Sequence, residues 1–178
     1  LKRSAKGANV PHAKATAGLA TVKMPTPEHV IIPMSMHIGA PAEPVVKKGD
    51  TVMVGTLIGK ASGFVSASIY SSVSGTVQDV APMRMVNGSM TTAVAIKTDG
   101  EQTIDPACVP PTVTDKPSLM AAVQNCGLVG VGGAGFPAHV KLAANTIDTL
   151  LINAAECEPY LTTDCREMLE CSDTIISG

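Results

Sequence analysis

Short runs of aliphatic residues, each closed by a glycine or a glycine–aspartate pair, follow one another closely between residues 27 and 102. The clearest runs lie at residues 30–33, 55–59 and 72–77, with a later one at residues 94–97. Short strands joined by tight glycine turns are typical of antiparallel sheets. We therefore predict a small all-β sandwich or barrel over residues 27–102, which we call the β module.

Two stretches without regular patterning flank the β module. Residues 1–26 are rich in Lys, Ala, Gly and Thr and show no periodicity, so we expect an extended N-terminal arm. Four prolines fall within residues 103–117, and proline disrupts both helices and strand ladders. The predicted organisation is an arm at residues 1–26, the β module at 27–102, a linker at 103–117 and an α/β domain at 118–178.

The chain beyond the linker has a mixed pattern. Residues 118–126 are typical of a helix, and the glycine-rich stretch at residues 127–137, which we call the glycine loop, follows directly. A second short helix is expected to reach Lys141, with proline tolerated in its first turn. Residues 147–153 form a short apolar run ended by a polar residue, which indicates a buried strand. A last helix follows, with Thr163 or Asp164 expected as its N-cap.

The glycine loop holds five glycines within nine residues. Glycine adopts positive φ without strain and lets a backbone approach a ligand closely, so such a loop can direct several N–H groups at an anion. A helix rather than a strand precedes the loop, which departs from the usual dinucleotide-binding fingerprint. By itself, the loop therefore fits a phosphate site and a plain glycine-rich turn equally well.

Polar side chains follow the predicted strand, in a stretch that we call the acidic segment (residues 153–160). Asn153 ends the strand, and Glu156 and Glu158 come directly after it. Ligands of open α/β sheets bind beyond the carboxyl ends of the strands, so these side chains could meet a ligand held by the glycine loop. The competing interpretation is a solvated acidic turn closed by Pro159.

The two stretches GLVGVGGAGFPAHVKL and LLINAAECEPYLTTDCR together resemble the RnfC family of the membrane-bound ferredoxin–NAD oxidoreductase complex. They are also similar to the flavin-and-NADH subunit of respiratory complex I, and the resemblance covers the chain from about Pro27 onward. It implies a barrel-sandwich hybrid β module, followed by the start of a Rossmann-like domain that binds FMN and NADH. The implied cofactor-binding residues are Gly130, Gly132, Gly133, Ala134, Gly135, Phe136, Lys141, Asn153, Glu156 and Glu158. Val131 and Ala155 depart from the complex I pattern, which has arginine and aspartate at these positions.

The resemblance also implies a function for the protein of which this chain is interpreted as an N-terminal fragment. That function is electron transfer between NADH and iron–sulfur centres through FMN, in a subunit of an ion-translocating ferredoxin:NAD oxidoreductase. The 4Fe-4S clusters are expected only beyond residue 178, and activity is expected of the longer protein rather than of the fragment. The implied partners are the other subunits of the complex and, indirectly, ferredoxin, at the cytoplasmic face of the cell membrane.

Two other functions stay open at this point. A soluble cobalamin reductase of the propanediol-utilisation type shares the glycine loop and the acidic segment, and a non-catalytic assembly or carrier module would need neither cofactor. Barrel-sandwich hybrids include biotinyl and lipoyl carriers, which bear the cofactor on a hairpin lysine. Residues 61–83 contain no lysine, so covalent attachment of biotin or lipoate there is excluded.

The composition of the chain excludes several further classes of function. A formal net charge of -2 provides no electrostatic footprint for nucleic acid or for an anionic membrane. No apolar run approaches the ~20 residues of a membrane span, so neither direct insertion nor a signal peptide is expected. The five cysteines are irregularly spaced without a C-x-x-C pair, so no metal site is predicted. The four histidines are expected in loops, and we assign no catalytic residue.

Overall fold

The computed structural model describes residues 10–144, 146–149 and 151–177, and the chain divides into two compact units. One unit is Pro25–Thr146, which we call the barrel unit. The other combines Leu1–Met24 with Ile147–Gly178, and we call it the terminal unit. Each unit is described by itself.

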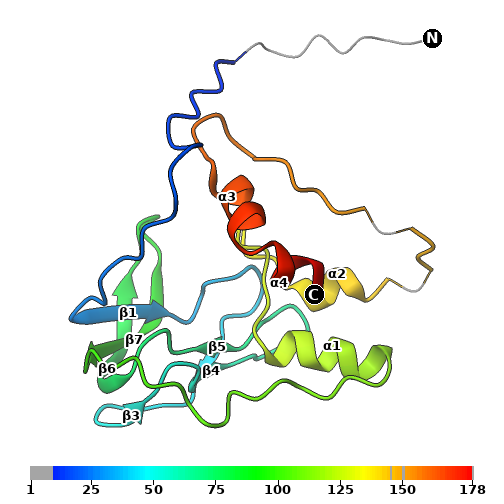
Figure 1. The fold of residues 1–178 in the computed structure, drawn as a ribbon. Helices are drawn as coiled ribbons and strands as arrows, with labels where there is room; N and C mark the ends of the chain where they lie inside the picture. The colour runs from blue at the N-terminus through cyan, green and yellow to red at the C-terminus, as the bar shows by residue number, and fades with distance from the viewer. Residues whose placement is uncertain (1–9, 145, 150, 178) are drawn as a thin grey trace, which may run out of the picture. The chain divides into compact units, whose positions relative to one another are not determined.

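The barrel unit contains two antiparallel sheets (Figure 1). The first has the strand order β1-β7-β6-β3, and the second has the order β2-β4-β5. The strands are β1 (His29–Pro33), β2 (Glu43–Pro44), β3 (Thr51–Val52), β4 (Leu57–Lys60), β5 (Ile69–Tyr70), β6 (Gly75–Arg84) and β7 (Met90–Thr98). The predicted all-β character of residues 27–102 is therefore confirmed.

The longest strands, β6 and β7, form a hairpin that is longer than the late strand predicted at residues 94–97. Its turn contains Asn87 and Gly88, and Gly88 has a φ of 84° that glycine adopts without strain. The Met85 N–H donates to the Ser89 carbonyl at 2.8 Å and closes the turn. The Asn-Gly pair is a strong hairpin signal, and it could have predicted this feature.

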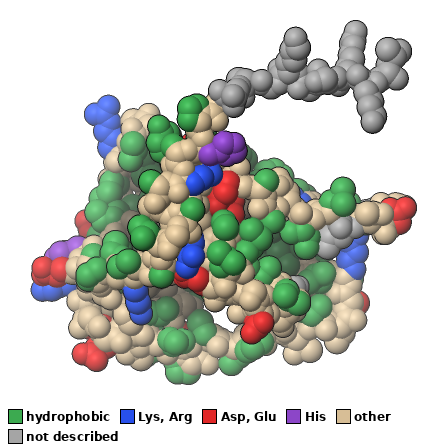
Figure 2. Space-filling model, turned by 45° about the horizontal axis from the view of Figure 1, so that its top comes forward, with side chains coloured by type: hydrophobic (Ala, Val, Ile, Leu, Met, Phe, Trp, Pro, Cys, Tyr) green, Lys and Arg blue, Asp and Glu red, His purple; other side chains and the backbone are tan. Residues whose placement is uncertain are grey.

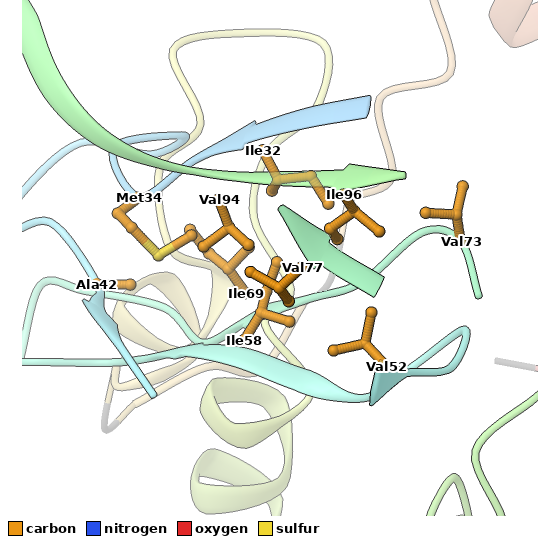
Figure 3. Close-up of a cluster of buried hydrophobic side chains, with 10 residues drawn as sticks. All are labelled: Ile32, Met34, Ala42, Val52, Ile58, Ile69, Val73, Val77, Val94 and Ile96. Carbon is orange, nitrogen blue, oxygen red and sulfur yellow. The ribbon is translucent and has the colours of Figure 1, made fainter. Parts of the chain in front are cut away.

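One aliphatic core lies between the two sheets, as Figure 3 shows. Its buried members are Ile32, Met34, Ala42, Val52, Ile58, Ile69, Val73, Val77, Val94 and Ile96. Every member is an aliphatic side chain or methionine, as expected for a chain with only 2% aromatic residues. Burying one such large side chain contributes roughly 1.5–3 kcal/mol, so this cluster is the main source of stability in the β module.

The proline-rich stretch begins as a part of the β module surface. The Val54 N–H donates to the Thr103 carbonyl at 2.8 Å, and the Asp105 N–H donates to the Val54 carbonyl at 2.9 Å. The Thr56 hydroxyl donates to the Asp105 carboxylate at 2.6 Å, and this bond lowers the pKa of Asp105. Residues 109–115 are exposed.

Two helices complete the barrel unit and pack against each other: α1 (Lys116–Asn125) and α2 (Ala138–Leu142) (Figure 1). Helix α1 begins with a capping box in which the Asp115 carboxylate accepts from the Ser118 N–H at 2.8 Å. Hydrogen bonds from Ser118 lower the pKa of Asp115. Gly127 ends this helix with a φ of 69°.

The terminal unit holds α3 (Thr163–Glu170) and α4 (Ser172–Ser177). The N-terminal arm lies on α3, since the N–H and hydroxyl of Thr21 both donate to the Glu170 carboxylate, at 3.1 Å and 2.5 Å. Arg166 pairs with the same carboxylate from one turn earlier. The bonds from Thr21, and then that from Arg166, lower the pKa of Glu170 to about 2.

The strand predicted at residues 147–153 differs in the structure. The described residues of this run form no strand, and Leu151 and Ile152 are 88% and 81% exposed. A buried strand needs neighbouring strands to receive its backbone hydrogen bonds, and the described part of the terminal unit contains helices only. An apolar run therefore predicts burial in a sheet only where such partners are present.

The helices within residues 10–144, 146–149 and 151–177 are short, and the longest of them, α1, has ten residues. Among these residues, no helix has both the length and the apolar character needed to cross a bilayer. On the face that Figure 2 shows, basic and acidic side chains stand singly or in small groups among uncharged surface. This distribution agrees with the small net charge.

Candidate functional site

The glycine loop is a turn closed at its base by backbone hydrogen bonds. Val129 and Pro137 form an antiparallel bridge, and the Gly130 N–H donates to the Phe136 carbonyl at 2.9 Å. The Gly130 carbonyl accepts from the N–H groups of Gly133 and Gly135, at 3.3 Å and 3.2 Å. The loop is therefore an ordered element and projects residues 131–134 from its base.

The middle of the loop is open. Residues 131–134 are exposed, and a Cβ built on Gly132 or Gly133 would meet no atom within 4 Å. Neither glycine has a positive φ. In the described part of the chain, the N–H groups of Val131, Gly132 and Ala134 have no hydrogen-bond acceptor. Neither packing nor backbone conformation accounts for glycine at positions 132 and 133, and these N–H donors lie beside them.

The ends of the loop are tightly packed. Gly127 has a φ of 69°, and a Cβ there would lie 2.2 Å from the Ser68 carbonyl oxygen. Gly135 has a φ of 68°, and its Cβ would lie 2.7 Å from the Met36 carbonyl oxygen and 3.0 Å from the Cα of His37. Real Cβ atoms do not approach backbone this closely, so contacts inside the protein account for glycine at both positions. The predicted role of Gly135 in lining a cofactor stays a prediction.

A positive charge lies next to the loop. Lys141 of α2 is exposed, and its Nζ is 5.9 Å from the centroid of the Phe136 ring, within the range of a cation–π interaction. The same Nζ lies 3.5 Å from the position that a Cβ on Gly130 would occupy. Helix α2 has only five residues, so its own dipole adds little, and Lys141 is the main source of positive potential there.

In the terminal unit, the residues of the acidic segment are engaged in local hydrogen bonds. The Asn153 side chain accepts from the Ala155 N–H at 3.0 Å, forming an Asx turn. The Glu156 carboxylate accepts from the Cys165 N–H at 3.0 Å, in the first turn of α3. Glu156 therefore acts as a cap for this helix, in place of the Thr163 or Asp164 that the sequence favours. Thr162 occupies the N-cap position without a side-chain cap.

Lys14 of the N-terminal arm fastens the acidic segment. Its Nζ donates to the carbonyls of Glu158 and Leu161, at 2.7 Å and 2.5 Å. The Thr16 hydroxyl lies 2.8 Å from the Thr162 hydroxyl, so a second bond joins the arm to the start of α3. This role of the arm could not be predicted, because the pattern of residues 1–26 carries no signal for a partner far along the chain.

The predicted site residues thus form two groups. The barrel unit brings together Gly130, Gly132, Gly133, Ala134, Gly135, Phe136 and Lys141. The terminal unit contains Asn153, Glu156 and Glu158, each engaged in a hydrogen bond of its own. In the part of the chain that the structure describes, no three His, Cys, Asp or Glu side chains are grouped to hold a metal ion.

Two of the four histidines lie in regular structure, contrary to the expectation that all lie in loops: His29 in β1 and His139 in α2. His139 is only 2% exposed, and its Nε2 lies 2.7 Å from the Phe64 carbonyl oxygen. His37 is also buried, and its Nε2 accepts from the Ala67 N–H at 3.2 Å. Its hydrogen-bond contacts are with backbone, which indicates a structural role.

Two known protein families match successive parts of the chain. The RnfC barrel sandwich hybrid domain matches residues 2–101. The Nuo51 FMN-binding domain matches residues 123–178, which include the end of α1, the glycine loop and the acidic segment. The first match covers more than half of the chain, and the chain belongs to the RnfC family.

Similar proteins carry related names. The chain is 46% identical over 158 residues to the C subunit of the Na(+)-translocating ferredoxin:NAD(+) oxidoreductase complex of Acetobacterium woodii, with 85% of this chain and 36% of that protein covered. It is 43% identical over 161 residues to the C subunit of the proton-translocating complex of Clostridium ljungdahlii, with 86% and 35% covered. It is 42% identical over 164 residues to the C subunit of the ion-translocating oxidoreductase complex of Rhodobacter capsulatus, with 87% and 31% covered. The chain therefore spans about a third of the length of these relatives.

Proposed function

We propose that this chain supplies part of the FMN site in an electron-transfer subunit of an ion-translocating ferredoxin:NAD oxidoreductase. The observation that carries the proposal is the open middle of the glycine loop. Gly132 and Gly133 face free space, N–H groups without an acceptor among the described residues lie beside them, and Lys141 adds a positive charge. The match of residues 123–178 to an FMN-binding domain and the names of the relatives support the same function.

The residues of the loop fit the chemical groups of FMN. A phosphate is an anion, and backbone N–H groups together with one lysine are common ligands for it. The lack of Cβ atoms at positions 132 and 133 leaves room for a flat ring or a phosphate to approach the backbone. Bound FMN would accept a hydride from NADH and pass electrons singly to iron–sulfur centres, while the protein binds and orients it.

The acidic segment is proposed to supply hydrogen-bond acceptors, whereas the glycine loop supplies donors. Because the Cys165 N–H holds one oxygen of Glu156, that carboxylate is oriented and its second oxygen can accept a further hydrogen bond. Glu158 is exposed, and Lys14 holds its backbone carbonyl rather than its carboxylate. We propose that Asn153, Glu156 and Glu158 border the flavin and the nicotinamide, accept hydrogen bonds from them and take no part in proton transfer.

The proposal extends to the organisation of the protein. Residues 118–178 would form the start of a Rossmann-like FMN and NADH domain, joined to the β module by the linker at residues 103–117. The 4Fe-4S clusters would be held by sequence beyond residue 178. The partners would be the other subunits of the complex and, indirectly, ferredoxin, at the inner face of the cell membrane. Nothing in the fold or the similarities favours a cobalamin reductase or a non-catalytic module.

An absorption spectrum of the native protein tests this function. Purified protein should be yellow, and NADH should bleach the flavin bands under anaerobic conditions. After removal of the flavin, titration with FMN should restore the spectrum. Native protein that is colourless and binds no added FMN would rule the proposed function out, whereas flavin that NADH fails to reduce would rule out the NADH part alone.

A further inference from the structure

The tip of a hairpin in the β module, residues 61–68, contacts the amino-terminal end of the glycine loop directly and its carboxyl-terminal end through the segment that follows β1. We propose that this hairpin tip positions the glycine loop for its ligand, with Phe64 and His139 as positioning residues. The proposal rests on the proposed FMN site for its binding measurements only. In biotinyl and lipoyl carriers the equivalent hairpin bears the modified lysine, and residues 61–83 contain none, so the tip is free for another use.

The carboxyl-terminal end of the loop is held through the segment that follows β1. The Ile38 N–H donates to the Gly135 carbonyl at 3.2 Å, and Gly135 has no room for a side chain against Met36 and His37. On its other side, this segment meets the hairpin tip, because the Ala40 N–H donates to the Val65 carbonyl at 2.9 Å. The loop end, the connecting segment and the hairpin tip are therefore in successive contact.

The amino-terminal end of the loop is held by the same hairpin. Gly127 packs against the Ser68 carbonyl so closely that a Cβ would lie 2.2 Å from its oxygen. The Gln124 side chain of α1 donates to the Gly63 carbonyl at 3.2 Å, and the Tyr70 hydroxyl donates to the Asn125 carbonyl. Burial raises the pKa of Tyr70, which keeps its hydroxyl protonated as a donor.

His139 joins the hairpin tip to the helix that follows the loop. Its Nε2–H donates to the Phe64 carbonyl at 2.7 Å, and the Phe64 ring meets the imidazole edge-on, with centroids 5.8 Å apart and planes at 87°. Phe64 is 65% exposed, yet it lies over a histidine that is 2% exposed. The Nδ1 of His139 has no hydrogen-bond partner in the described part of the chain. A buried imidazole with an unpaired nitrogen is costly, so its one hydrogen bond and the aromatic contact must hold it in place.

Through these contacts the β module holds the glycine loop, whose backbone is proposed to bind the ligand. Both ends of the loop are fixed to it, while residues 131–134 in the middle stay open. Fixing a loop in its binding conformation before the ligand arrives raises affinity, because less conformational entropy is lost on binding. Changes at Phe64 or His139 should therefore alter ligand affinity without touching the ligand.

Three variants and one control in the native protein test this role. His139→Ala removes the donor and the aromatic contact, and Phe64→Ala removes the contact alone at an exposed position. His139→Gln keeps a donor at the position of Nε2 and should rescue the loop in part. Val86→Ala is the control, because Val86 is fully exposed in the β6–β7 turn of the same module.

Two measurements separate positioning from general stability. Hydrogen exchange of the Gly130, Gly133 and Gly135 amides measures how readily the loop opens in the absence of ligand. Titration with FMN measures the affinity of the protein for FMN. His139→Ala should accelerate exchange and weaken FMN binding by about 3- to 10-fold, since one hydrogen bond and one contact are lost. Phe64→Ala and His139→Gln each lose the aromatic contact but keep the hydrogen bond, so both should have a smaller effect in the same direction, while Val86→Ala should match the unmodified protein.

The possible outcomes are distinct. Normal loop exchange in folded Phe64→Ala and His139→Ala proteins would overturn the positioning role, and so would a His139→Gln protein whose loop amides exchange as fast as those of His139→Ala. If the His139→Ala protein does not fold, loop exchange in the Phe64→Ala protein decides whether the positioning role holds. If the unmodified protein binds no FMN, the proposed function fails, and the exchange rates still decide whether the hairpin tip positions the loop.

Discussion

The glycine loop and the acidic segment, each considered within its own unit, are held in different ways. The ends of the glycine loop pack on backbone of the β module, which has a buried aliphatic core behind it. The acidic segment is held by hydrogen bonds at the surface, from Lys14 and Thr16 of the arm and to its own Glu156. Exposed hydrogen bonds contribute little net free energy, so the acidic segment should open at a lower free-energy cost than the glycine loop.

The largest effects on stability and on FMN affinity should come from replacing glycines of the glycine loop by valine. Gly135→Val places a branched side chain at a φ of 68° and against backbone, so it should destabilise the barrel unit by roughly 2–4 kcal/mol. Gly133→Val meets open space and should change stability by less than about 0.5 kcal/mol. It should nevertheless weaken FMN binding by at least about tenfold, because the side chain occupies the ligand's approach. Thermal melts and FMN titrations of both variants check this.

The same two variants can also disprove the contrast between the open middle of the glycine loop and its packed end. Normal FMN binding by Gly133→Val would mean that the open middle of the loop is only a turn. A Gly135→Val protein with an unchanged melting temperature would mean that the packing of the loop end is not tight in solution.

A smaller effect should follow from Lys14→Ala. This change removes the donor to the Glu158 and Leu161 carbonyls and should cost about 0.5–1.5 kcal/mol locally. Amides of the acidic segment should exchange faster, while those of the β module should not change. Lys23→Ala, at an exposed lysine of the same arm, is the matched control. Equal exchange rates in the two variants would show that the arm does not hold the acidic segment.

The smallest effect should be a pH dependence of the attachment of the N-terminal arm to α3. The pKa of Glu170 is lowered from 4.5 to about 2 in the folded chain, so its contribution to stability is complete above about pH 4.5. This contribution is lost as the pH falls toward 2, because the protonated carboxyl no longer accepts fully from Thr21 and Arg166. Proteolysis of the arm by an acid protease should accelerate over that range. Glu170→Gln should show fast cleavage already at pH 5, and the same pH profile in both proteins would contradict this assignment.

Local features of this protein were predictable from the sequence by itself. Glycine-closed aliphatic runs predicted the sheets of the β module, and Asp115 with Ser118 forms a cap from residues three apart. The glycine loop and the short helix up to Lys141 also lie where the pattern placed them. These features depend on neighbours in the chain, whose spacing the sequence states directly.

Other features were decided only by tertiary structure. Gly133 and Gly135 look alike in the sequence, yet one faces open space and the other the Met36 backbone. Likewise, Glu156 caps a helix, His139 is buried beneath Phe64, and residues 147–149 and 151–153 form no strand. The physical reason is that burial, close contacts and strand pairing depend on which distant backbone lies opposite a residue. No local pattern specifies that partner.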